Sequence, residues 1–131
     1  MHASPDLTLT LPARAENVAV VRHAFGGLGE ALSVSDQLLS DIKLAVTEAC
    51  TNVVIHAYPD GEGPMEISAD IGPDHLSVVV RDEGRGVMPR ADSPGLGLGL
   101  PLIATLADSL ELGTGDDDVT EVRMVFRIGE G

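Results

Sequence analysis

The stretch "DIKLAVTEACTNVVIHAY" (residues 41–58) has the apolar spacing of a buried helix, yet it also carries a row of polar residues. Its apolar stripe recurs at helical spacing at Leu38, Ile42, Ala45, Ala49 and Val53. Glu48, Asn52 and His56 form the separate polar row, because residues four apart share one face of a helix. A solvated helix face is the simplest explanation of such a row, and a functional site is the alternative.

The 131 residues around this helix suit one domain, which we expect to span residues 1–131. With two Phe, one Tyr and no Trp, a core must be aliphatic and rich in alanine. The net charge of -13 argues against nucleic acid or an anionic membrane as a partner, because both attract cationic surfaces. The single cysteine, Cys50, cannot form an internal disulfide, and no leader or membrane span is recognisable, so we expect a cytoplasmic protein.

Further elements follow from periodicity and from turn residues. Leu7, Leu9 and Leu11 alternate with threonines, which predicts a half-buried strand that Pro12 ends. We then expect a helix over 15–32, followed by the helix quoted above, which starts at Ser35 or Asp36. Two strands at 65–71 and 75–84 come next, and a loop at 88–99 leads to a helix at 100–112 with Pro101 in its first turn. A turn at 113–121 and a strand at 120–128 close the chain. This order predicts an α+β fold, a two-layer sandwich whose helices cover one face of a mixed, mostly antiparallel sheet.

Three polar or glycine-rich features interrupt these segments, and each permits a chemistry. On the helix, Asn52 offers a carbonyl oxygen to a hard cation such as Mg²⁺, and Glu48, one turn earlier, can act as a general base. In "DEGRG" (82–86), Asp82 either closes a strand-ending turn or accepts a hydrogen bond from the exocyclic amine of a purine, with Gly84 and Gly86 leaving room for the ring.

The third feature is "GLGLG" (95–99), which stands directly before a predicted helix. Gly95, Gly97 and Gly99 leave backbone N–H groups unobstructed at the positive end of that helix, where phosphates bind. A flexible loop is the plain alternative. The spacing is neither the dinucleotide fingerprint nor a P-loop, so nucleotide binding here needs another scaffold.

In this order, "EACTN", "DEGRG" and "GLGLGLPLI" resemble the N, G1 and G2 boxes of the superfamily of histidine kinases, gyrases and heat-shock chaperone ATPases, whose ATP-binding unit is the Bergerat fold. Over nearly the whole chain the sequence more closely resembles the anti-sigma-factor serine/threonine kinases, because "LPARAENVAVVRHAF" (11–25) looks like their amino-terminal strand and helix. Sensor histidine kinases are a poorer match, since the chain has no room for a dimerising hairpin that carries an acceptor histidine.

The resemblance implies that ATP and Mg²⁺ are the cofactors and assigns roles to the motif residues. Asn52 would hold Mg²⁺, Glu48 would accept the proton of an attacking hydroxyl, and Asp82 would bind the adenine amine. The glycines of the two boxes would bind nucleotide, at Gly84, Gly86, Gly95, Gly97 and Gly99. Arg85 or Arg90 would help to neutralise phosphate.

The partners implied by the resemblance are a sigma factor, an anti-anti-sigma protein that is phosphorylated, and a second copy of the chain in a homodimer. Two alternatives stay open at this point. One is an ATP-binding docking module without phosphotransfer, and the other is a structural domain that binds no ligand.

Overall fold

The computed structural model describes residues 4–59, 61–84, 96–114 and 119–129. The elements along the chain are β1 (Leu7–Pro12), α1 (Ala15–Ala31), α2 (Asp36–Asn52), the π-helical segment η1 (Val53–Ala57), β2 (Pro64–Ile71), β3 (His75–Asp82), α3 (Leu96–Leu106), β4 (Ser109–Thr114) and β5 (Thr120–Arg127). No helix within these ranges is long and apolar enough to span a membrane.

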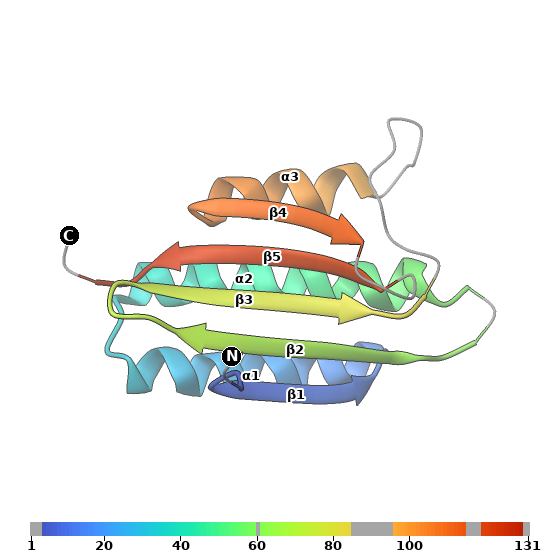
Figure 1. Ribbon diagram of the computed structural model, residues 1–131, viewed down its shortest axis with the longest axis horizontal. Coiled ribbons are helices and arrows are strands. Elements are labelled where there is room, and N and C mark those ends of the chain that lie inside the picture. The colour runs from blue at the N-terminus through green and yellow to red at the C-terminus, as the bar shows by residue number, and fades with distance from the viewer. Residues whose placement is uncertain (1–3, 60, 85–95, 115–118, 130–131) are drawn as a thin grey trace.

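The strands form one five-stranded sheet in the order β1-β2-β3-β5-β4, and every neighbouring pair is antiparallel. The three helices lie on one face of this sheet (Figure 1). The predicted α+β sandwich is therefore confirmed, with a sheet that is antiparallel throughout its described strands rather than mixed.

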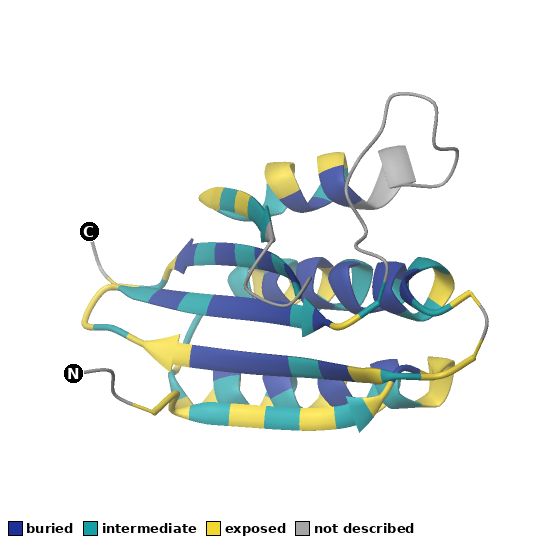
Figure 2. Ribbon diagram, turned by 45° about the vertical axis from the view of Figure 1, so that its right-hand side comes forward, coloured by how far each residue is buried: buried dark blue, intermediate teal, exposed yellow. Residues whose placement is uncertain are grey.

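The core lies between the sheet and the helices, and it has the predicted aliphatic character. Both phenylalanines, Phe25 of α1 and Phe126 of β5, are fully buried among aliphatic side chains. The alternation predicted for β1 is visible as teal and yellow bands in Figure 2. Cys50 is buried and free, and its burial raises the pKa of the thiol to about 12, so it stays protonated and unreactive.

Gly29 of α1 lies closely against α2, and the glycines of this segment do not end the helix. A Cβ at Gly29 would overlap the side chain of Leu39, and one at Gly26 would reach the stem of Lys43. Glycine lowers helix propensity, and at Gly29 the close packing of α1 on α2 offsets this loss.

The segment after residue 106 corrects the predicted helix over 100–112. α3 ends at Leu106, and β4 pairs antiparallel with β5, with Leu110 opposite Met124. Asp108 begins this pairing, because its N–H donates to the Val125 carbonyl and its carboxylate accepts the Arg127 N–H at 2.6 Å. The apolar run that follows residue 106 suits either a helix or a strand, and its hydrogen bonds to β5 make it a strand.

The start of α3 corrects the expected place of Pro101. The helix begins at Leu96, five residues before the proline, so Pro101 lies inside the helix and not in its first turn. Its ring nitrogen cannot donate to the carbonyl of Gly97, which a helix interior would require. The predicted loop over 88–99 is correspondingly too long at its carboxyl end, because a glycine-rich run can still adopt helix when packing on α2 supports it.

We expect Ser35→Ala to lower the free energy of unfolding by about 1 kcal/mol, and the melting temperature by roughly 3–5 °C. Ser35 is the N-cap of α2, and its hydroxyl accepts the Leu38 N–H at 3.1 Å. Thermal unfolding followed by circular dichroism measures the change. Ser35→Asp keeps an acceptor at the cap and should remain close to the parent, and equal loss in both variants would contradict the capping role.

Candidate functional site

Asn52 is the last residue of α2 and lies 93% buried, with an exposed fraction of 7%. Its amide nitrogen has no hydrogen-bond partner among the described residues. A buried, unpaired amide costs free energy, so it marks a position where a further polar group is needed. Glu48, one turn earlier on the same face, is half-buried.

The helix changes its winding directly after Asn52. η1, Val53–Ala57, is π-helical, so hydrogen bonds there join residues five apart. Glu48 and Asn52 of the predicted row therefore belong to α2, whereas His56 belongs to η1. Such π segments occur frequently at functional sites.

Asp82 ends β3 and is 3% exposed. Burial raises the pKa of its carboxyl group, and the hydrogen bond that it accepts from the Gly84 N–H at 3.0 Å opposes this shift. This hydrogen bond from a side chain to the backbone two residues on is typical of an Asp that closes a turn at the end of a strand, one of the two roles predicted for Asp82. One carboxylate oxygen is engaged by the turn, which leaves the other as an acceptor for a ligand.

Gly84 joins the two motif segments physically. A Cβ at this position would overlap the carbonyl oxygen of Ala57, the last residue of η1. Only glycine therefore lets the turn after β3 lie directly against the end of the Asn52 helix. The ends of η1 and β3 and the start of β5 lie together at the right-hand edge of the molecule in Figure 1.

Thr120, the first residue of β5, is a further candidate for the site that sequence reasoning did not identify. It lies directly opposite Asp82 in the β3–β5 register and is 2% exposed. Its hydroxyl oxygen has no partner within the described part of the chain. A threonine at the start of a strand is common and does not by itself indicate a site. Its position opposite Asp82 is what makes it a candidate, and that position is known only from the pairing register of β3 and β5.

The glycine-rich segment is described only in part. Gly97 and Gly99 lie in the first two turns of α3, as backbone near its amino-terminal end. Gly86 and Gly95 lie outside the described residues, and so do Arg85 and Arg90. The phosphate-binding role of the glycines stays a prediction.

Two depressions flank the turn from Asp82 to Gly84. One, of about 390 Å³, is lined by Ala57, Tyr58 and Gly84, among others. The other, of about 120 Å³, includes Asp82 in its lining. Glu83 borders both, so this turn is the wall between them.

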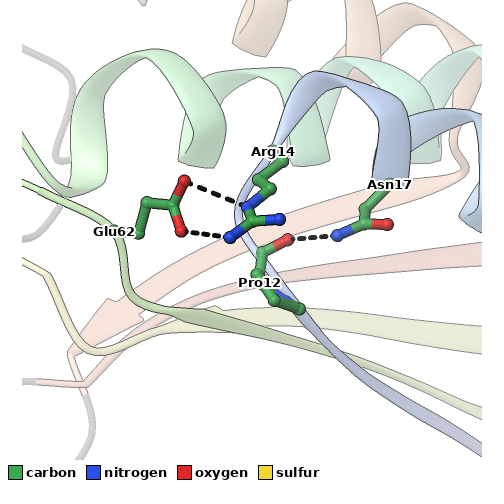
Figure 3. Close-up of polar contacts among 4 residues, drawn as sticks. All are labelled: Pro12, Arg14, Asn17 and Glu62. Atoms are coloured by element: carbon green, nitrogen blue, oxygen red, sulfur yellow. Dashed lines mark hydrogen bonds and ion pairs between the residues drawn. The ribbon is translucent and has the colours of Figure 1, made fainter.

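The loop beside the larger depression is tied to the β1–α1 corner. The Arg14 guanidinium donates two hydrogen bonds to Glu62, at 3.0 and 2.8 Å, and Asn17 donates to the Pro12 carbonyl at 2.8 Å (Figure 3). Arg14 and Glu62 are about half exposed, so their ion pair orients the loop and adds little to stability.

Comparison with known sequences identifies relatives of this chain. A family model described as a histidine kinase-like ATPase domain matches residues 11–126. The serine-protein kinase RsbW of Halalkalibacterium halodurans is 37% identical in an alignment 127 positions long, and the alignment covers 86% of this chain and 78% of the relative. RsbW of Bacillus cereus is 34% identical in an alignment of the same length, which covers 86% of this chain and 79% of that relative.

Solved structures show the same fold. The RsbU and RsbW domains of a Mycobacterium tuberculosis protein superpose with a TM-score of 0.76 at 21% identity, over 98% of this chain and 34% of that one. This chain thus spans about a third of that solved chain. A chain of the SiaB-SiaC complex from Pseudomonas aeruginosa superposes with a TM-score of 0.64 at 16% identity, over 95% and 91% of the two chains.

These findings confirm the family that the three motifs indicated. Because a family model matches residues 11–126 and two serine-protein kinases are 37% and 34% identical, this chain belongs to the histidine kinase-like ATPase family, in the group of the serine-protein kinases.

Proposed function

We propose that this chain is a cytoplasmic switch protein that holds a sigma factor inactive and uses ATP with Mg²⁺ to phosphorylate a serine or threonine of an anti-anti-sigma protein. Its relatives named above are serine-protein kinases, which supports the reaction class. The observation that carries the proposal for the site is the contact of Gly84 with Ala57, because it joins the Asn52 helix to the Asp82 turn.

The polar groups at this junction fit a nucleotide. Asp82 and Thr120 lie opposite each other on the neighbouring strands β3 and β5. Among the described residues, Asp82 accepts a side-chain hydrogen bond at one carboxylate oxygen, and the buried Thr120 hydroxyl has no partner. Together they provide an acceptor and a donor for a purine edge. The close approach at Gly84 leaves this edge unobstructed by a side chain.

The buried amide nitrogen of Asn52, which has no partner among the described residues, would suit a phosphate oxygen, and the carbonyl oxygen of the same amide would be the ligand for a cation. No cluster of three or more His, Cys, Asp or Glu side chains that could hold a metal occurs within the described ranges. We propose that a divalent ion would be held by Asn52 and by the nucleotide itself, as Mg²⁺ in kinases commonly is. Gly97 and Gly99 near the start of α3 would face the phosphates with backbone groups.

In the proposed reaction, ATP supplies the γ-phosphoryl group, which becomes bonded to the acceptor hydroxyl oxygen as its bond to ADP breaks. Glu48 accepts the proton of that hydroxyl, and its position one turn from Asn52 keeps base and cation site on one helix face. Asn52 and Asp82 hold the two ends of the nucleotide.

Phosphorylation would release the antagonist by charge. A phosphoserine or phosphothreonine adds a charge of about -1.5 to -2 at neutral pH, which this chain of net charge -13 would repel. The sigma factor is then held when its competitor is phosphorylated. We further propose a homodimer, on the basis of the resemblance to anti-sigma kinases.

The kinase activity is testable by phosphotransfer. The proteins that co-purify with this chain from an extract of its own cells, with and without ATP, supply the antagonist. With γ-labelled ATP and Mg²⁺, we expect label on a serine or threonine of that antagonist, and chelation of Mg²⁺ should abolish it. ATP binding without transfer would contradict the kinase and favour the docking module, in which nucleotide is a structural ligand.

A further inference from the structure

Tyr58, the first residue after η1, forms hydrogen bonds with two other segments of the chain, the turn after β3 and the start of β2. Its hydroxyl accepts the Glu83 N–H at 2.8 Å and donates to the carbonyl of Pro64 at the start of β2. The phenol therefore links the end of the Asn52 helix, the turn after Asp82 and the first residue of β2.

The ring has a fitted place. A Cβ at Gly63 would overlap the Tyr58 ring, so the ring packs flush on the backbone there. Partial burial raises the pKa of the phenol, and the hydrogen bond from the Glu83 N–H partly opposes this shift. Tyr58 thus keeps its proton at neutral pH and can donate to Pro64 while it accepts from Glu83.

Glu83 stands between the two residues on which the proposed purine site depends. Asp82 accepts the Gly84 N–H, Gly84 contacts the Ala57 carbonyl, and the Glu83 N–H is held by Tyr58. Three consecutive residues are thus tied down separately. Without the phenol hydroxyl, Glu83 would lose the hydrogen bond to its N–H, and the turn that separates the two depressions would be less constrained.

We propose that Tyr58 is a positioning residue for nucleotide: through the Glu83 amide, its hydroxyl holds the Asp82–Gly84 turn in the geometry that accepts the purine. This inference rests on the proposed function. Tyr58 acts on affinity and not on the transfer step, because it reaches the turn after β3 and neither Glu48 nor Asn52.

Tyr58→Phe removes only the hydroxyl and tests this role. Loss of one hydrogen bond that orders a binding site should weaken ATP affinity, measured by calorimetry, roughly tenfold. The rate at saturating ATP should stay within about twofold of the parent, so the effect lies in KM and not in kcat. Hydrogen exchange at the Glu83 amide, measured by NMR without nucleotide, should accelerate while exchange in the core stays unchanged.

Two further variants separate positioning from stability. Ser35→Ala removes a hydroxyl from the other end of α2 and should leave ATP affinity unchanged despite its cost in stability. Gly63→Ala places a methyl group against the Tyr58 ring and leaves the hydroxyl present. It should also lower ATP affinity, and it keeps the test available if Tyr58→Phe fails to fold.

Each outcome decides a claim. Equal ATP affinity of Tyr58→Phe and the parent, or unchanged exchange at Glu83, overturns the positioning role while the kinase proposal stands. Equal losses in Tyr58→Phe and Ser35→Ala would also overturn it, since they would indicate general destabilisation. A folded parent that binds no ATP overturns the proposed function, and the role of Tyr58 falls with it.

Discussion

Glu48→Ala is expected to lower the rate of phosphotransfer roughly 10²- to 10⁴-fold while ATP still binds. The carboxylate is proposed to accept the hydroxyl proton only as transfer occurs, so its loss should appear in kcat and not in nucleotide affinity. Single-turnover transfer of labelled phosphate to the antagonist measures the rate, and calorimetry measures the affinity.

Glu48→Gln is the matched control, because it keeps the size and polarity of the side chain but cannot take up a proton. Both variants should show the same loss of transfer. Under the docking alternative, Glu48→Ala would leave control of the partner unchanged. Transfer by Glu48→Gln at the parent rate would remove Glu48 from its role as base.

Asp82→Asn is expected to weaken ATP binding roughly 10- to 150-fold, whichever of the two functions holds. A hydrogen bond to a charged acceptor contributes about 1.5–3 kcal/mol, and the amide that replaces the carboxylate loses this charge. The variant should fold as stably as the parent, because a buried carboxylate whose pKa is raised by burial is itself destabilising when ionised. Calorimetry with ATP, together with thermal unfolding, measures both quantities, and unchanged affinity would show that Asp82 does not bind adenine.

A pH series provides a second test of Asp82. Its folded-state pKa is raised above the ordinary value of 3.8, so the folded protein binds this proton more tightly than the unfolded chain does. As the pH falls through the raised pKa, the carboxylate is neutralised, and ATP affinity should decline while this group adds to stability. Asp82→Asn should lack that part of the pH dependence.

Much of the architecture was predictable because local pattern and tertiary environment agree. The alternating leucines of β1 face the core on one side, and Ser35 caps α2 with its own side chain. Asn52 was a candidate because its carbonyl oxygen lies one turn from Glu48, and Asp82 because it closes an apolar strand. The structure shows that both side chains are buried. In these cases the physical cause lies within one turn of helix or one strand.

The sequence by itself determined the helical layer and four of the five described strands, since each depends on periodicity or capping. It also predicted the two ends of the candidate site from isolated polar residues. The tertiary structure alone decided that residues 109–114 are a strand, because the hydrogen bonds that hold β4 come from β5. It also decided that Thr120 faces Asp82 and that Tyr58 holds the turn between them and η1. These contacts join residues distant in the chain, and no local preference encodes a register or a close approach between segments.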